Sequence, residues 1–384
     1  MGLITLDRVP RIIQAEGAIE TLGATLAGVS PSGAAILVVI DPGLKALGIG
    51  DIVARSLLKA GLGPILFDDI KSDPTMAQVD EAACLAQDEH AAAVVAIGGG
   101  SAMDVGKSVS AVFGDIMPAR HYGLCANPFP VGRLFSICVP TTSGTGAETT
   151  RTAVLAAADG SKVWLWGDEM KPDLVLLDPA LTVGLPPHLT AATGVDALVH
   201  AIEASTNANA NELNDLYCHE AIRLVTRHLP RAVEAPADIA ARAGLQWAAC
   251  LAGIGIDNCG TAIAHNIGHA LASLRPIHHG RAVGLALRAT LPWNVEGDDG
   301  RFAAVAAAMG GPADALALPA AYENLLRRVD LKLSLAGEGH DGITAAQLAA
   351  QMARPENEAM RRSNRRPVGD ADLSRFAETM LAGA

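Results

Sequence analysis

The sequence AAAVVAIGGGS at positions 91–101 leads an unbroken apolar run into three successive glycines. The run Ala91–Ile97 is typical of a strand buried on both faces, and a helix is expected to begin near Ala102. Glycines at a strand-to-helix turn let the backbone approach a phosphate closely, and the helix N-terminus offers free N–H groups. A turn that is merely tight would have the same composition, and the segment lacks the G-x-G-x-x-G fingerprint.

Similar apolar runs occur on both sides of this segment, separated by stretches of helix length. They are Ala34–Ile40, Ile65–Phe67, Leu134–Val139 and Leu174–Leu177. This alternation predicts a parallel sheet with helices on both faces. A hairpin is expected to interrupt the pattern, pairing Ala153–Ala157 with Val163–Trp166 around a turn at Asp159-Gly160.

The pattern becomes almost wholly helical after Leu185-Pro186-Pro187. The predicted fold class is therefore an α/β N-terminal domain with a parallel sheet, residues 1–185, followed by an all-helical C-terminal domain, residues 186–384. Within the second domain, the arginine-rich segment Arg354–Pro367 is expected to be a solvated loop before a last short helix at Asp370–Leu381.

Composition excludes several classes of function. The chain has 384 residues, of which 50% are hydrophobic and 3% aromatic, and its formal net charge is −12. This charge argues against nucleic acid and anionic membrane surfaces as partners, because both require a basic face. No apolar run suggests a membrane span and no secretory signal is visible. The six cysteines are scattered without a CxxC pair, so we interpret them as reduced core residues of a cytoplasmic protein.

A second segment suited to an anion follows the strand at Leu134–Val139. It reads Pro140-Thr141-Thr142-Ser143-Gly144-Thr145-Gly146, and its hydroxyl and N–H groups can bind phosphate. Two such segments at the carboxyl ends of parallel strands predict a crevice for a nucleotide-like ligand.

Two aspartates near these strands each fit two roles. Asp41 ends the Ala34–Ile40 strand, where a carboxylate can bind ribose hydroxyls and repel a 2′-phosphate, or can simply form the Asp-Pro-Gly turn. Asp104, in the first turn of the helix after the glycines, can cap that helix or hold a ribose hydroxyl. Lys162, in the predicted hairpin, is by itself a surface lysine.

An ionisable pair lies in an otherwise apolar helix of the second domain. Asp196 and His200 are four residues apart and share one helical face. Burying such a pair costs free energy unless it is hydrogen-bonded or binds a metal, so the pattern fits either a buried Asp–His hydrogen bond or two ligands of a divalent ion.

Histidines are concentrated further along the same domain. His265, His269, His278 and His279 fall within fifteen residues, in a chain that has eleven histidines. The HxxxH spacing lacks the HExxH glutamate of zinc proteases, and spacing alone does not select which histidines bind metal. A metal in this domain and a nucleotide in the other predict hydride chemistry in a cleft between the domains, with the metal as Lewis acid.

These motifs, in this order, resemble the iron-containing (group III) alcohol dehydrogenases over essentially the full chain. The matching stretches are Gly98-Gly99-Gly100-Ser101-x-x-Asp104-x-x-Lys107, Pro140-Thr141-Thr142-x-Gly144-Thr145-x-x-Glu148, Asp178-Pro179, Ala191-Ala192-Thr193-Gly194-x-Asp196-Ala197-x-x-His200-x-x-Glu203, His265-x-x-x-His269 and His279-Gly280.

The resemblance implies a dinucleotide-binding N-terminal domain, a metal-binding catalytic C-terminal domain and a homo-oligomer, commonly a dimer. It implies four metal ligands, with His279 preferred to His278 because a glycine follows it: Asp196, His200, His265 and His279. His269 would lie near substrate and nicotinamide as the catalytic residue. The implied cofactor-binding residues are Asp41, Gly98, Gly99, Gly100, Ser101, Asp104, Thr141, Thr142, Thr145 and Lys162.

The resemblance also implies the reaction. It is hydride transfer between NAD and an alcohol held by Fe²⁺, with Zn²⁺ or another divalent ion as an alternative metal, in an alcohol dehydrogenase or aldehyde reductase that acts on small molecules. Dehydroquinate synthase-like or glycerol dehydrogenase-like enzymes are the enzymatic alternative, but they use three protein ligands, and here all four positions are filled. A binding module without catalysis is the non-enzymatic alternative.

Overall fold

The computed structural model describes residues 4–336, 340 and 342–382, and the chain divides into two compact units. The first, here the N-terminal unit, comprises Arg8–Thr142 and Ala147–Thr182. The second, the C-terminal unit, comprises Val183–Ala384 together with Met1–Asp7 and Ser143–Gly146. The chain therefore passes from the N-terminal unit into the C-terminal unit at Ser143 and back into the N-terminal unit at Ala147.

The N-terminal unit contains a six-stranded parallel sheet with the order β1-β8-β5-β4-β2-β3. Its strands are β1 (Arg11–Gln14), β2 (Ala35–Ile40), β3 (Gly63–Phe67), β4 (Ala93–Gly98), β5 (Phe135–Pro140) and β8 (Leu174–Leu177). The five apolar runs noted in the sequence all form strands of this sheet. The edge strand β1 was not expected, because its sequence RIIQ is short and polar at both ends.

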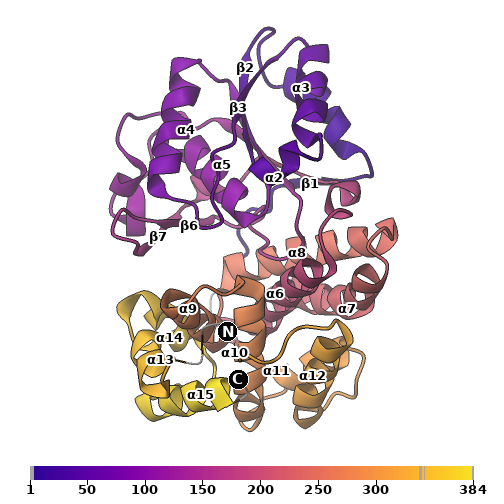
Figure 1. Ribbon diagram of the computed structural model, residues 1–384, viewed down its shortest axis with the longest axis vertical. Helices are drawn as coiled ribbons and strands as arrows, with labels where there is room; N and C mark the ends of the chain where they lie inside the picture. Colours follow the sequence, from indigo (N-terminus) through magenta and orange to yellow (C-terminus); the bar gives the residue numbers. More distant parts are fainter. Residues whose placement is uncertain (1–3, 337–339, 341, 383–384) are drawn as a thin grey trace. The chain divides into compact units, whose positions relative to one another are not determined.

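Alternate residues of the strands pack on opposite faces of the sheet. Leu37 and Val39 join one hydrophobic cluster with α4 and α5, whereas Ile36, Val38 and Ile40 join another with α1 and α3. Figure 1 shows these helices on the two sides of the sheet. The helices of this unit are α1 (Leu22–Ala27), α2 (Pro42–Lys45), α3 (Ile49–Lys59), α4 (Met76–Asp88) and α5 (Gly100–Val112). The prediction of a parallel sheet covered on both faces is confirmed.

A separate antiparallel hairpin completes this unit. It pairs β6 (Thr152–Ala156) with β7 (Lys162–Trp166), within one residue of the expected hairpin. One face is buried with α4 and α5 through Ala153, Leu155 and Leu165.

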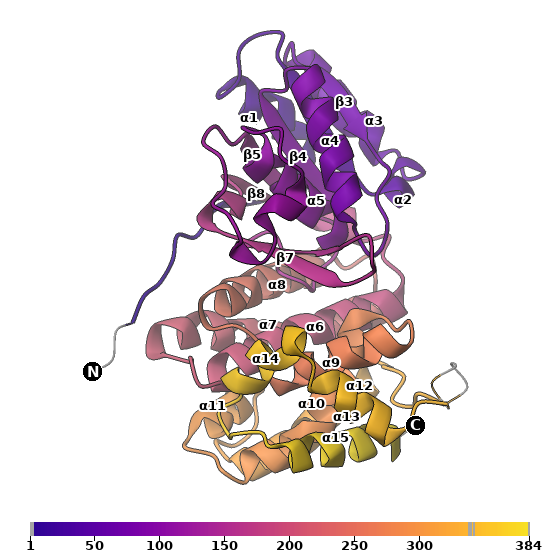
Figure 2. The ribbon, with the colours of Figure 1, turned by 90° about the vertical axis from the view of Figure 1, so that its left-hand side faces the viewer.

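The C-terminal unit is helical throughout its regular structure, as expected. Its longer helices are α6 (Pro187–Thr206), α7 (Glu212–Glu234), α8 (Ile239–Cys259), α9 (Ile263–Leu274), α10 (His279–Val295), α11 (Arg301–Ala308), α12 (Leu318–Arg328), α13 (Ala345–Met352), α14 (Glu358–Ser363) and α15 (Asp370–Ala382). Every residue of α6 from Thr190 onward is buried, because α7, α8 and α10 surround it. The last three helices pack against α9 and α10 (Figure 2).

Among the described residues, α8 alone is long and apolar enough to cross a membrane by length and composition. Most of it is buried against α6 and α7 within this unit, and it carries the buried charge of Arg242. Helix α8 is therefore a core helix of this unit, and its apolar composition reflects this burial.

Two expectations were wrong. Arg354–Pro367 is not a loop throughout, because it contains α14, and its arginines bond to distant groups: Arg366 stacks 3.9 Å from the Trp293 ring, and Arg365 pairs with Asp299. The cysteines are all free, but Cys84 and Cys125 are exposed rather than in the core.

Candidate functional site

The structure brings together a group of four potential metal ligands in the C-terminal unit. Asp196 and His200 come from α6, His265 from α9, and His279 is the first residue of α10. One ligand atom from each lies within 4.8 Å of the others. Asp196 Oδ1 is 3.8 Å from His200 Nε2, 4.0 Å from His265 Nε2 and 3.5 Å from His279 Nε2. Asp196 Oδ1 therefore lies within 4.0 Å of a ring nitrogen of each of the three histidines.

Close helix packing produces this arrangement. A Cβ on Gly280 would lie 2.1 Å from the Ala192 carbonyl oxygen and 2.9 Å from Asp196 Cβ, so only glycine allows the start of α10 to touch α6. The same contact brings His279 next to Asp196. His278, the residue before α10, is not in the group.

The donor atoms fit a divalent ion. Asp196 Oδ1 and His265 Nε2 are buried and have no hydrogen-bond partner among the described residues, an arrangement that costs free energy unless a bound group satisfies these atoms. Burial lowers the pKa of both His200 and His265, which keeps the imidazoles neutral with lone pairs available. Burial acts to raise the pKa of Asp196, but the neighbouring histidines hold it below its ordinary value. A carboxylate with neutral imidazoles is a common donor set for such ions.

Solvent reaches the group at one ligand. Asp196, His200 and His265 are buried, whereas the side chain of His279 is 39% exposed. His269 lies beside the group without belonging to it: its ring centroid is 5.3 Å from that of His279 and 6.1 Å from that of His265. This half-buried histidine is near enough to act on a molecule held by the four ligands.

The site contains one residue to which the sequence assigned no role. Glu203 lies on α6 beyond His200 and is buried, with Oε2 2.6 Å from His265 Nδ1. Burial raises the pKa of Glu203 to about 7, although backbone N–H groups oppose this shift. The sequence feature that could have indicated this residue is its position, three residues after His200 in an apolar helix.

The predicted cofactor residues of the N-terminal unit gather at one edge of its sheet. The chain passes from β2 outward to β3 and then returns to the other side of β2 as β4, so the connections after β2 and β4 diverge there. Such a switch point is where open α/β sheets bind ligands. Asp41 follows β2, Gly98 ends β4, and Thr141 follows β5, and the Thr141 N–H donates to the Gly98 carbonyl at 2.9 Å.

The glycine turn leaves room and free donors for an anion. A Cβ on Gly98 would lie 2.8 Å from Ala102 Cβ and 3.1 Å from Asp41 Cβ, so a larger residue would not fit. Helix α5 begins at Gly100 after the cap residue Gly99, and no side chain caps it. Its first N–H groups therefore have no intrahelical partner and are available to a phosphate.

The remaining cofactor candidates have defined protein contacts. Asp41 Oδ1 accepts a hydrogen bond from the Gly43 N–H, so the turn-forming role exists, and the Cβ of Asp41 lies beside Gly98. Ser101 Oγ donates to the Ser72 carbonyl, and Lys162 pairs with Asp73 at 2.7 Å.

Asp104, Thr142 and Thr145 occupy three different settings. Asp104 Oδ2 accepts from the Val154 N–H of the hairpin, and Thr142 Oγ1 lies 3.5 Å from where a Cβ of Gly99 would be. Thr145 belongs to the segment 143–146 of the C-terminal unit, where Gly144 meets Thr193 and Gly146 meets Gly253 so closely that neither has room for a Cβ. The structure thus gathers Asp41, the glycines and Thr141–Thr142, but not Thr145, within one unit.

A switch point suited to a nucleotide and a largely buried Asp–His₃ group point to a class: an oxidoreductase that works with a nucleotide and a divalent metal. The chain belongs to the iron-containing alcohol dehydrogenase family. The family model "Iron-containing alcohol dehydrogenase" matches residues 10–179, and "Fe-containing alcohol dehydrogenase family, C-terminal" matches residues 190–379. The chain is accordingly an oxidoreductase that acts on CH–OH groups with NAD.

Individual relatives agree with this assignment. The NAD-dependent methanol dehydrogenase of Bacillus methanolicus is 31% identical over 319 residues, which cover 83% of each chain. The choline dehydrogenase of Bacillus subtilis (strain 168) is 33% identical over 306 residues, covering 79% of this chain and 76% of that one. The crystal structure of sulfoacetaldehyde reductase from Bifidobacterium kashiwanohense in complex with NAD⁺ superposes with a TM-score of 0.90 at 26% identity and covers 100% of both chains. The resemblance seen in the sequence is confirmed.

Proposed function

We propose that this protein is an NAD-dependent alcohol dehydrogenase, or an aldehyde reductase in the reverse direction, whose divalent metal is held by Asp196, His200, His265 and His279. The observation that carries the proposal is this group of four, with ligand atoms within 4.8 Å of one another and buried lone pairs on Asp196 Oδ1 and His265 Nε2 that no donor in the described part of the chain satisfies. A divalent ion held there would supply the Lewis acidity that lowers the pKa of a substrate hydroxyl or polarises a carbonyl.

The surrounding residues have separate tasks in this proposal. His269 exchanges the substrate proton, because it adjoins the group and is only half-buried. The glycines 98–100 and the start of α5 bind the pyrophosphate, with Ser101, Asp104, Thr141, Thr142, Thr145 and Lys162 as further cofactor residues. Asp41 binds the ribose hydroxyls, which favours NAD over NADP.

Further assignments belong to the same proposal. Residues 1–185 bind the dinucleotide and residues 186–384 bind the metal. Fe²⁺ is the proposed metal because of the family, and Zn²⁺ is the alternative, since imidazole and carboxylate ligands suit both ions. The protein is proposed to act as a cytoplasmic homodimer on a small alcohol or aldehyde.

Activity of metal-reloaded protein tests the proposal. Chelated protein is reloaded anaerobically with Fe²⁺ or Zn²⁺ and mixed with NAD⁺ and an alcohol panel that includes the named substrates of relatives, methanol and choline, while NADH absorbance is followed. We expect activity to return with one of the two ions. NADH formation that is equal with and without metal would overturn the metal assignment. Metal binding without net NADH formation from any alcohol, and without NADH consumption when aldehydes are supplied with NADH, would favour the dehydroquinate synthase-like alternative.

A further inference from the structure

The carboxylate of Glu203 is surrounded by N–H donors from the start of α9. Oε1 accepts a hydrogen bond from the Ala264 N–H at 2.6 Å, and Oε2 accepts one from the Ala262 N–H at 2.8 Å. Oε2 also lies 2.6 Å from His265 Nδ1. Ala262 is the cap residue of α9 and offers no side-chain cap, so Glu203 satisfies N–H groups that the helix leaves free.

These contacts determine which nitrogen of His265 carries its proton. The two backbone N–H groups can only donate, so they require acceptors at both carboxylate oxygens. Three N–H groups directed at the two oxygens favour the ionised form of Glu203. An ionised carboxylate cannot donate to His265 Nδ1, so in this form that nitrogen carries the ring proton. The lone pair of the neutral ring is then on Nε2, which is buried without a hydrogen-bond partner and faces Asp196 Oδ1 at 4.0 Å.

A glutamine of the same shape cannot replace this carboxylate. It has one acceptor oxygen, whereas the surroundings present three N–H groups at two positions. With its NH₂ group at the Oε1 position it would face the Ala264 N–H, donor against donor. With its NH₂ group at the Oε2 position it would face the Ala262 N–H and would favour a His265 ring that carries its proton on Nε2.

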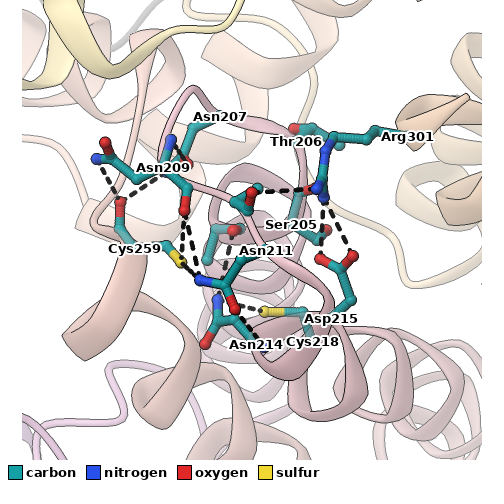
Figure 3. Close-up of polar contacts among 12 residues, drawn as sticks. Ser205, Thr206, Asn207, Asn209, Asn211, Asn214, Asp215, Cys218, Cys259 and Arg301 are labelled. Atoms are coloured by element: carbon teal, nitrogen blue, oxygen red, sulfur yellow. Dashed lines mark hydrogen bonds and ion pairs between the residues drawn. The ribbon is translucent and has the colours of Figure 1, made fainter. Parts of the chain in front are cut away.

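A neighbouring set of hydrogen bonds fastens the same junction without touching His265. Asn207, at the end of α6, donates through Nδ2 to the carbonyls of Cys259 and Gly260 at 2.9 and 3.0 Å. Asn209 donates to the Cys259 carbonyl as well. Figure 3 shows both asparagines beside Cys259. The junction between α8 and α9 is therefore held to α6 twice, and only Glu203 also contacts a histidine of the metal group.

We propose that Glu203 is a positioning residue, whose carboxylate holds His265 in its Nδ1–H tautomer and thereby presents Nε2 to the metal. The inference rests on the metal site of the proposed function. Partners of this kind orient histidine ligands, and their loss typically lowers metal affinity roughly 10- to 100-fold.

Zn²⁺ affinity of the full chain tests this proposal. Chelated wild type, Glu203→Gln and Asn207→Ala are titrated with Zn²⁺ in competition with a chromophoric chelator. We expect Glu203→Gln to bind Zn²⁺ roughly 10- to 100-fold more weakly than wild type. Asn207→Ala, which weakens the same junction but leaves His265 paired, is expected to change the affinity less than about threefold.

A second measurement reads the tautomer directly. In metal-free protein labelled with ¹⁵N in histidine, long-range ¹H–¹⁵N spectra should show the His265 ring protonated at Nδ1, assigned through its absence in His265→Ala. Glu203→Gln should move the population toward the Nε2–H form, and Asn207→Ala should not. If Glu203→Gln does not fold, the wild-type spectrum alone decides, because an Nε2–H ring there overturns the proposal.

The outcomes separate this inference from the proposed function. Equal Zn²⁺ affinities for wild type and Glu203→Gln, with tight binding by both, would overturn the role of Glu203 and leave the metal site in place. Failure of the wild type itself to bind Zn²⁺ or Fe²⁺ would instead overturn the metal site of the proposed function.

Discussion

His265 and His269 are one helical turn apart on α9, yet they differ in their relation to the donor group. His265 is buried with its Nε2 toward Asp196, whereas His269 is half-buried beside the group. These two settings suit the proposed roles, His265 as a metal ligand and His269 as a proton carrier.

This difference predicts that two alanine variants, both less active, differ in their metal content. His265→Ala should purify with less than one tenth of the wild-type metal and with no measurable activity, because a buried ligand is lost. His269→Ala should retain its metal and lose roughly 100-fold in kcat, as is typical for removal of a general acid or base. Metal analysis and NADH absorbance measure both. Unchanged metal and activity in His265→Ala would refute the ligand assignment.

The charge of the single residue Asp41 predicts a preference for NAD over NADP. Asp41→Gly should reduce the preference for NAD over NADP by about tenfold or more, because it removes a carboxylate that repels a 2′-phosphate. Asp41→Asn is the matched control. It removes the charge but keeps an oxygen that can accept the Gly43 N–H, so it separates loss of the charge from loss of the turn contact. The ratios of kcat/KM for the two cofactors decide, and equal use of both by the wild type would contradict the prediction.

At the scale of elements, Lys107 joins α5 to the segment before the hairpin. Its buried ammonium donates to the carbonyls of Ala147, Thr150 and Thr152 and to the Thr150 hydroxyl, at 2.7 to 3.2 Å. It also lies 3.5 Å from Asp104 Oδ1, and the other Asp104 oxygen accepts from Val154 of β6. One lysine thus fastens the helix after the glycine turn to the hairpin.

Removing this charge should destabilise the protein strongly. Lys107→Met leaves several buried carbonyls and the Asp104 carboxylate without their cation, which costs about 3–5 kcal/mol and lowers the melting temperature by roughly 10 °C. Lys162→Met is the matched control on β7: its ion pair with Asp73 is exposed, so the change should be within about 2 °C. Differential scanning calorimetry measures both melting temperatures. Equal shifts for the two variants would show that the burial of Lys107 is not the cause of the destabilisation.

At the scale of the whole molecule, a buried carboxyl group couples stability to pH. Burial raises the pKa of Glu148 to about 7, and Lys107 opposes the shift only in part. Because this pKa is above the value of 4.5 expected in the unfolded chain, the stabilising contribution of the bound proton is complete below about pH 4.5. It is lost as the pH rises through 7.

Glu148→Gln should therefore flatten the pH profile of stability. The amide imitates the protonated acid at every pH. Between pH 5 and pH 8 the free energy of unfolding of the variant should therefore fall by up to about 3 kcal/mol less than that of wild type. Melting temperatures of metal-free protein across this range test the prediction. A parallel decline for wild type and Glu148→Gln would rule out Glu148 as the source.

Removal of the metal should affect the two units unequally. A bound ion present at 1,000 times its Kd stabilises the protein by about 4 kcal/mol, so chelation should lower the melting temperature by roughly 10 °C. NAD⁺ affinity should change less than about threefold, because most of the proposed cofactor residues belong to the other unit. Calorimetry and fluorescence titration with NADH measure the two effects. A tenfold loss of NADH affinity on chelation would contradict this separation.

Much of the fold could be predicted from local patterns. Continuous apolar runs predicted five strands to within two residues at their ends, since a strand buried on both faces requires such a run. The short edge strand β1 was missed, because a half-exposed strand of four residues has no distinctive pattern. Arg354–Pro367 was misinterpreted because its arginines look solvated in sequence, whereas their partners are residues such as Trp293 and Asp299, far away in the chain.

Local patterns were enough to predict the apolar runs that form the strands, the glycine turn and the residue types of the proposed metal group, because these depend on neighbours along the chain. Spacing left His278 and His279 equivalent, and the roles of Asp104 and Glu203 open. Only the tertiary structure placed His279 beside Asp196, through the contact that Gly280 permits between α10 and α6. It likewise paired Asp104 with Val154 and Glu203 with His265. These partners are 50 and 62 residues apart, and only packing brings such groups within hydrogen-bond distance.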